Sequence, residues 1–180
     1  MATWIALLRG VNVGGKHLLP MADLRAALTD LGLEDVATYV QSGNVVFRSS
    51  KRSATKLGEE IEAAIEALRD FRVPVLVLNA KALERAAAAC PYSDAPEPKL
   101  VQLAFLWSKP KHPDLDGLRA LATKTEAFEL DGDVFHLHAP DGIGRSKLAA
   151  QVERKLGVEA TVRNLRTVTK LLELAGVAPG

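Results

Sequence analysis

The sequence predicts an α+β protein made of two ferredoxin-like repeats, each with the order β-α-β-β-α-β and each followed by one further helix. The first observation behind this prediction is that apolar runs and helix-periodic segments follow the same order on both sides of a Pro-rich stretch, residues 91–98. The second is a repeated junction, VLVLN before AKALERAAAAC and ATVRN before LRTVTKLLELA. The third is a short turn between two apolar runs, Ser42-Gly43 in one half and Asp131-Gly132 in the other, which suits a two-residue hairpin.

The first half supplies one complete series of elements. We expect strands at 4–10, 36–40, 44–50 and 72–79, with helices at 21–32 and 53–70. Asn79 then begins the additional helix, because an Asn at such a junction can accept a hydrogen bond from a first-turn amide. We expect this first repeat to occupy residues 1–90.

The second half repeats the series after the Pro-rich linker, over residues 99–180. We expect strands at 100–107, 126–130, 133–139 and 159–164, with helices at 112–123 and 146–157. Asn164 occupies the capping position that corresponds to Asn79. The runs WIALL, PVLVL and LVQLAFLW are apolar at successive positions, so we expect these strands to be buried on both faces.

Composition indicates the cellular compartment of the protein and limits the classes of partner that it could bind. The single cysteine, Cys90, cannot form an internal disulfide and excludes a Cys-based zinc or iron–sulfur site. No apolar run approaches the roughly 20 residues that span a bilayer, so we expect a cytoplasmic protein without a membrane partner. With 23 Lys and Arg against 22 Asp and Glu, the net charge of +1 does not by itself indicate a nucleic-acid binder. We assign Arg154 and Lys155 to a solvated helix face.

Four loops combine glycines or small polar residues with cations, and they supply the candidate ligand-binding residues. The first loop follows the first strand, where paired glycines let successive amides point into one concavity beside a lysine. Its candidates are Arg9, Asn12, Gly14, Gly15 and Lys16.

The first loop also matches most of the phosphate-loop pattern G-x-x-x-x-G-K-[ST] from Gly10 to Lys16. His17 stands where Ser or Thr would bind magnesium, and three residues through Pro20 separate the loop from its helix. We therefore reject a magnesium-dependent NTPase and expect no cofactor.

The other three loops are weighed against purely structural roles. The second contains Ser42, Gly43 and Asn44, for which a hairpin turn is the favoured interpretation. The third joins a strand to a helix. Its free first-turn amides and two cations could bind a phosphate or carboxylate, and the alternative, equally favoured, is that its serine only caps the helix. Its candidates are Gly142, Gly144, Arg145, Ser146 and Lys147. The fourth contains Arg163 and Asn164, where a guanidinium could bind an anion or form a salt bridge.

Several of these motifs together resemble a known family. The segments LLRGVNVGGK, MADLR, TYVQSGNVVF, PDGIGRSKL and TVRN occur in the order typical of the bacterial family named domain of unknown function 1697. The resemblance spans nearly the whole chain and implies two intertwined α+β repeats. It implies no activity, because the family has none assigned. This chain has Leu165 where an aromatic residue often follows the Asn, so the resemblance does not extend to a stacking role there.

Catalytic residues are not identifiable from the sequence. His136 and His138 alternate along one strand, but no third metal ligand accompanies them, and we expect an edge or solvent-facing position for both. His17 could act as a base and Ser146 or Ser42 as a nucleophile, yet the sequence identifies no acid–base partner for any of them. We therefore predict no metal site and leave the catalytic residues unknown.

Three hypotheses for function remain. We prefer a binding module in which the loops at Gly14–Lys16 and Gly144–Lys147 hold a nucleotide or a nucleic-acid phosphate, which predicts that these loops converge. The second is an enzyme acting on a small phosphorylated or carboxylated substrate, which predicts a closed pocket with a partnered His or Ser. The third is a protein-interaction module, which predicts an exposed apolar patch without a concave polar site. Low aromatic content, 5% of residues, argues against base stacking on an open sheet.

Overall fold

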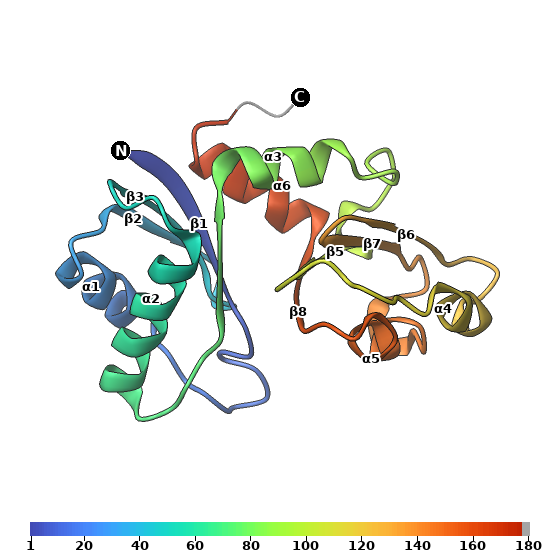
Figure 1. Ribbon diagram of the computed structural model, residues 1–180, viewed down its shortest axis with the longest axis horizontal. Helices are drawn as coiled ribbons and strands as arrows, with labels where there is room; N and C mark the ends of the chain where they lie inside the picture. Colours follow the sequence, from blue (N-terminus) through green and yellow to red (C-terminus); the bar gives the residue numbers. More distant parts are fainter. Residues whose placement is uncertain (178–180) are drawn as a thin grey trace. The chain divides into compact units, whose positions relative to one another are not determined.

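The protein has an α+β structure with two four-stranded antiparallel sheets, described here from a computed structural model over residues 1–177 (Figure 1). Its contacts divide the chain into two compact units. Among the described residues, unit 1 contains Met1–Glu84 and residues 170–177, and unit 2 contains Arg85–Thr169. Within the described residues there are six α-helices, and no helix has the length and hydropathy needed to cross a membrane.

Unit 1 contains one complete series of four strands and two helices, and a further helix starts directly after the last strand. The sheet has the order β2-β3-β1-β4, with every neighbouring pair antiparallel. Helices α1 and α2 lie on one face of this sheet (Figure 1). The elements are β1 (Ala2–Leu8), α1 (Met21–Asp30), β2 (Glu34–Tyr39), β3 (Asn44–Ser49), α2 (Ala54–Arg69), β4 (Val75–Asn79) and the start of α3 (Ala80–Ala88), whose residues from Arg85 belong to unit 2.

The core of unit 1 forms where alternate strand residues meet the buried stripes of α1 and α2. Trp4 and Leu8 of β1 belong to this core, together with Ile61 of α2. Ile5 and Leu7, which point to the opposite face of β1, are also fully buried, as the continuous apolar run predicts. Strand β4 differs from this prediction, because its residues alternate between buried and half-buried at the edge of the sheet.

Unit 2 repeats this arrangement with the sheet order β6-β7-β5-β8, again antiparallel throughout. Helices α4 and α5 pack on one face of the sheet and share an apolar core with it. The elements are β5 (Val101–Leu106), α4 (Leu115–Leu121), β6 (Ala127–Asp131), β7 (Val134–His138), α5 (Val152–Leu156), β8 (Ala160–Asn164) and the start of α6 (Leu165–Leu174), whose residues from Lys170 belong to unit 1. Three short 3₁₀ turns are present at Pro98–Leu100, Ile143–Arg145 and Ala149–Gln151.

The helix expected at 146–157 is shorter than predicted. A 3₁₀ turn comes first, and Gln151 at φ −114° and ψ 1° interrupts the α conformation before α5 begins. Gly157 then ends α5 at φ +70°. The apolar periodicity predicts one continuous helix here, whereas the structure has a 3₁₀ turn followed by a separate α-helical turn.

The two units share specific side-chain roles as well as topology. Glu62 of α2 accepts a hydrogen bond from the N–H of Val75 at 2.9 Å, and Glu153 of α5 accepts one from Ala160 at 2.6 Å. Val75 and Ala160 each begin the last strand of their sheet. Buried residues recur at the same sequence separations from these glutamates, at Leu57, Ile61 and Ile65 in unit 1 and at Leu148, Val152 and Leu156 in unit 2.

The additional helices begin at the asparagines identified in the sequence. Asn79 Oδ1 accepts from the N–H of Ala82 at 2.8 Å, and Asn164 Oδ1 accepts from the N–H of Thr167 at 2.9 Å. Both contacts are N-cap hydrogen bonds, so the predicted capping role of both asparagines is confirmed.

The two hairpins differ in length, which corrects one expectation. In unit 2, Asp131 ends β6 and pairs with Val134, so the hairpin has a two-residue turn as expected, but the turn residues are Gly132 and Asp133 rather than Asp131 and Gly132. In unit 1, Tyr39 pairs with Asn44, so the connection is the four-residue segment 40–43 rather than Ser42-Gly43 alone. Turn chemistry at Ser and Gly suggested a tight hairpin, but cross-strand pairing fixes the longer loop.

Candidate functional site

In unit 1, Asn12 joins two of the candidate loops through its side chain. Its Nδ2 donates to the carbonyl of Leu19 at 2.9 Å and to that of Gln41 at 2.7 Å, and its Oδ1 accepts from the Leu19 N–H at 2.8 Å. The backbone of Asn12 has a φ of +54°, a conformation that Asn tolerates better than most residues. Because both side-chain donors and the carbonyl are in use, Asn12 shapes the loops rather than presenting its amide to a ligand.

The paired glycines of the same loop form a tight turn. Lys16 donates its backbone N–H to Val13 at 3.1 Å, and Gly14 and Gly15 between them have φ values of +58° and +73°. Positive φ at both central residues is the pattern of a type I′ turn, which these glycines adopt without strain. The Lys16 side chain is exposed at this turn.

The hairpin candidates of unit 1 have structural roles. Asn44 is fully buried, and its Nδ2 donates to the Tyr39 carbonyl at 3.1 Å and to Ser42 Oγ at 3.0 Å. Gly43 accepts a hydrogen bond from the Leu8 N–H at 2.8 Å through its carbonyl. These contacts agree with the hairpin-turn interpretation of the second loop.

The segment before β4, with Phe71 and Pro74, also contacts the first candidate loop of unit 1. Arg9 donates its backbone N–H to the Pro74 carbonyl at 3.0 Å, and the His17 ring stacks on Phe71 with centroids 4.8 Å apart. His17 Nδ1 lies 3.2 Å from the Gly10 carbonyl oxygen. The ring of His17 therefore contacts backbone and an aromatic neighbour.

Three large apolar side chains are exposed in these unit 1 loops. Val13, Leu18 and Val40 retain 64%, 61% and 51% of their surface. Exposed apolar side chains are the feature that the protein-interaction hypothesis expects.

In unit 2, the third candidate loop separates into buried and exposed residues. Ser146 is buried, and its Oγ accepts from the N–H of Ala149 at 2.9 Å, which confirms its capping role. Gly142 turns the chain at φ +96°, and Gly144 lies in the 3₁₀ turn that follows. The side chains of Arg145 and Lys147 are exposed on either side of Ser146.

Arg163 and Asn164 at the end of β8 bond to their own unit. Arg163 is 9% exposed, and its Nη1 donates to Thr161 Oγ1 at 2.9 Å and to the Val162 carbonyl at 2.8 Å. Burial lowers the pKa of Arg163 to about 10, so the guanidinium remains charged at neutral pH. Asn164 uses its carbonyl oxygen in the helix cap described above.

The two strand histidines occupy different environments, which corrects the expectation for His136. His136 is fully buried, neither ring nitrogen has a hydrogen-bond partner, and burial lowers its pKa. His138 is half-buried and stacks on Tyr92 with centroids 5.9 Å apart. Strand alternation places both rings on one face but does not say which face is covered. Across residues 1–177, no group of three or more His, Cys, Asp or Glu side chains is placed to hold a metal ion.

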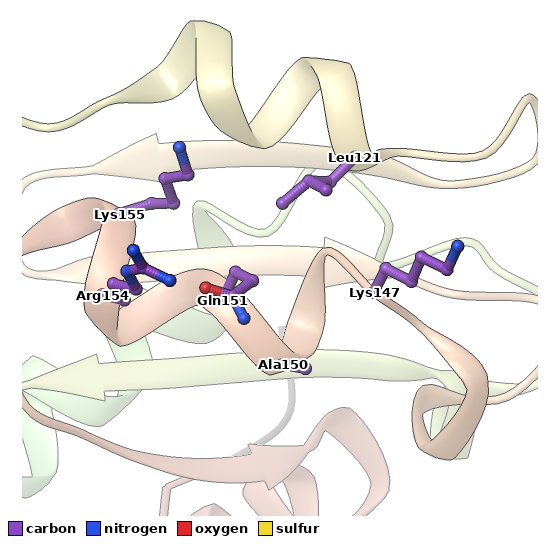
Figure 2. Close-up of a pocket in the computed structure, with 6 residues that line it drawn as sticks. All are labelled: Leu121, Lys147, Ala150, Gln151, Arg154 and Lys155. Carbon is purple, nitrogen blue, oxygen red and sulfur yellow. The ribbon is translucent and has the colours of Figure 1, made fainter.

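A concave surface lies elsewhere in unit 2, between α4 and the helical segment that follows Ser146. It is an open hollow of about 420 Å³. Figure 2 shows Lys147 at one end and Arg154 and Lys155 at the other, with apolar and amide groups between them. The lining residues are Leu121, Lys147, Ala150, Gln151, Arg154 and Lys155. We call this surface the basic hollow.

The charge of the basic hollow is only partly neutralised. Lys155 Nζ donates to Asp114 Oδ2 at 2.7 Å, and this contact holds the pKa of the Asp114 carboxyl below its usual value. Within the described part of the chain, neither Lys147 nor Arg154 has an ion-pair or hydrogen-bond partner for its side chain. Two cations therefore face solvent beside one paired lysine.

The corresponding surface of unit 1 has a different charge. When the sequences around α2 and α5 are aligned at Glu62 and Glu153, Lys147 corresponds to Lys56. The next four lining positions of this segment, Ala150, Gln151, Arg154 and Lys155, correspond to Glu59, Glu60, Ala63 and Ala64. The buried residues of the two helices match, so the shared fold does not account for the cations of unit 2.

Of the residues lining the basic hollow, only Lys147 belongs to the candidate set, and our assignment of Arg154 and Lys155 to a solvated face missed their concave setting. Gln151 and Leu121 were not singled out either. The excess of cations in unit 2 could have been found from the sequence by aligning the second helices of the two repeats position by position. The predicted loops Gly14–Lys16 and Gly144–Lys147 belong to different units, so each unit contains half of that predicted set.

Fold and surface together define an α+β protein of two similar units, one of which bears a cationic hollow. The family model described as "Protein of unknown function (DUF1697)" matches residues 1–136, and the chain belongs to this family. The chain is also similar to the solved structure of conserved bacterial protein SP0830 from Streptococcus pneumoniae, with 26% identity and a TM-score of 0.70. That similarity covers 97% of this chain and 98% of the other. No curated protein matches the chain.

Proposed function

We propose that the protein is a binding module for an anionic, phosphate-bearing ligand, and that the ligand occupies the basic hollow of unit 2. The observation that carries this proposal is the presence of Lys147 and Arg154, two cations without partners among the described residues, in one concave surface. A volume of about 420 Å³ lies within the range of small-ligand sites.

The chemistry of the lining suits a phosphate. A guanidinium such as that of Arg154 can donate two parallel hydrogen bonds to phosphate oxygens, and the ammonium of Lys147 adds a compact charge. Gln151 can donate from its amide without adding charge. Lys155, fixed by Asp114, contributes to the local positive potential and is less available for direct contact.

A binding role agrees better with the candidate side chains than an enzymatic one. The hydroxyl of Ser146 accepts a backbone N–H as a cap, and His17 contacts a backbone carbonyl and Phe71. These two side chains, which could in principle act as nucleophile and base, thus stabilise the local fold, and nothing in their contacts favours proton transfer. The exposed apolar side chains of the unit 1 loops agree with the protein-interaction alternative, but that alternative gives no role to Lys147 and Arg154, the cations in the hollow of unit 2 that lack partners among the described residues.

The architecture supports two further parts of the proposal. Each unit has the β-α-β-β-α-β order and a sheet order, β2-β3-β1-β4 or β6-β7-β5-β8, that suits the ferredoxin-like class. We propose duplicated repeats over residues 1–90 and 99–180 with the Pro-rich linker 91–98 between them. Cys90 is buried and unpaired, which suits the reducing cytoplasm.

A thermal-shift comparison tests the proposed function. The probes are inorganic phosphate, adenosine monophosphate and a ten-residue oligothymidylate, added to the wild type and to the Lys147→Gln, Arg154→Gln double variant. A probe at about a hundred times its dissociation constant stabilises by roughly 2.7 kcal/mol, enough to raise the melting temperature by several degrees. We expect a shift in the wild type that is lost in the double variant.

The matched control is Lys56→Gln, which removes the corresponding lysine of unit 1. Lys56 is exposed, so this substitution is expected to change stability by less than about 0.5 kcal/mol and to retain the ligand-induced shift. Absence of a shift with all three probes, or an equal shift in the double variant, would overturn the proposal.

A further inference from the structure

The distribution of charge along the basic hollow is uneven, and this unevenness constrains the ligand. Lys147 precedes Arg154 by seven residues in a segment of 3₁₀ and α-helical turns. At a rise of 1.5 Å or more per residue, the two positions are about 10 Å apart along the segment. In Figure 2 the Lys147 amine points away from Arg154.

The middle of the hollow is neutral. Leu121 from α4 and Ala150 supply apolar surface there, and Gln151 supplies an amide. Figure 2 shows the Leu121 side chain projecting from α4 into the space between Lys147 and the two cations at the opposite end. An anion placed in this middle section would lie beside apolar groups and apart from both cationic ends.

The two ends also differ in what they offer. At one end Arg154 is free of ion pairs among the described residues, while the adjacent Lys155 is already bonded to Asp114. At the other end Lys147 is exposed, and the nearby Ser146 is used as a cap. One anionic group at each end would satisfy both free cations, whereas one compact anion would satisfy a single end.

From this geometry, and resting on the proposed function, we infer that the basic hollow binds a ligand with two phosphate groups separated by a neutral, partly apolar body. One phosphate contacts Lys147 and the other contacts Arg154, while the body lies over Leu121 and Ala150. Small bisphosphate compounds and two phosphates of a nucleic-acid strand both have this chemistry.

A ligand series tests the spacing directly by isothermal titration calorimetry. The probes are hexane-1,6-diol bisphosphate, hexyl phosphate with the same apolar chain and one phosphate, and a ten-residue oligothymidylate. The second phosphate of the bisphosphate adds a charge-assisted contact with Lys147 that hexyl phosphate cannot make. We therefore expect the bisphosphate to bind the wild type about tenfold or more tighter than hexyl phosphate. In Lys147→Gln this ratio should fall to near one, and in Lys56→Gln it should remain at the wild-type value.

The outcomes separate this inference from the proposed function. If bisphosphate and hexyl phosphate bind equally and both depend on Arg154, the hollow is a single-anion site, so the inference fails and the proposed function stands. If no probe binds, both fail. A bisphosphate preference accompanied by oligothymidylate binding that Lys147→Gln also weakens supports the inference with a nucleic-acid source. A bisphosphate preference without oligothymidylate binding supports it with a small-molecule source.

Discussion

Replacing Gly43 with alanine should destabilise unit 1 more than replacing any loop glycine whose surroundings are open. Gly43 has a φ of +75°, and a Cβ built there would lie 2.5 Å from the Leu8 Cβ and 2.8 Å from the Val11 Cγ2. Both neighbours are buried, with exposures of 1% for each, so neither can move freely aside. Left-handed backbone costs an alanine roughly 1–2 kcal/mol. Overpacking adds about 1–3 kcal/mol, while the reduced freedom of the unfolded chain returns about 0.4–1 kcal/mol.

These contributions predict a loss of about 1–5 kcal/mol for Gly43→Ala. Gly15→Ala is the matched control, because Gly15 has a φ of +73° with nothing within 4 Å of its built Cβ. This control carries the backbone strain without the overlap, so we expect a smaller loss of about 0–2 kcal/mol. The difference between the two variants isolates the steric overlap with Leu8 and Val11.

Urea unfolding followed by tryptophan fluorescence measures both variants. The chain has two tryptophans, and Trp4 lies in the core of unit 1. Carrying both glycine variants in a Trp107→Phe background makes Trp4 the only tryptophan, so its signal reports on unit 1. Equal losses for Gly43→Ala and Gly15→Ala would refute the packing argument for the hairpin.

The remaining predictions concern a buried histidine and two helix caps. Burial lowers the pKa of His136 against the opposing influence of Asp131 and Glu129, so as pH falls through 6.5 the unfolded chain takes up this proton before the folded chain does. Stability should therefore be full above pH 6.5 and decline below it, and His136→Phe should flatten this part of the dependence in urea midpoints measured across that range. A wild-type midpoint that rises on acidification over the same interval would contradict the assignment. Asn79→Ala and Asn164→Ala should each cost about 1 kcal/mol by removing an N-cap bond, measured by thermal or urea unfolding, and a change near zero would mean that the cap contributes nothing.

Much of the fold could be predicted because its signals are local. Apolar periodicity placed the strands and helices of both repeats in order, and the chemistry of Asn79 and Asn164 marked the helices that follow them. The length of the first hairpin could not be predicted from Ser42-Gly43, because it is fixed by the pairing of Tyr39 with Asn44 across two strands. The interruption of the helix at Gln151 was likewise hidden, since the apolar pattern continues through it.

The candidate site was harder to predict, because a side chain's local pattern does not reveal which bonds it already makes. Asn12, Asn44 and Arg163 looked available for a ligand, yet each forms hydrogen bonds within its own unit. The local pattern around Arg154, by contrast, predicts an ordinary solvated face, and only the approach of α4 and α5 makes its surroundings concave. Concavity arises from residues distant in sequence, here Leu121 and Arg154, and no local motif encodes it.

The most direct test of the central claim is the affinity of the Gln151→Glu variant for hexane-1,6-diol bisphosphate, measured by isothermal titration calorimetry beside the wild type and Lys56→Gln. This substitution places in the middle of the basic hollow the carboxylate that unit 1 has at Glu60, the corresponding position. A charge there repels phosphate across a short distance, so we predict binding at least about tenfold weaker than in the wild type, and wild-type binding by Lys56→Gln. Equal affinity of Gln151→Glu and the wild type would contradict the claim that the hollow is the anion-binding site.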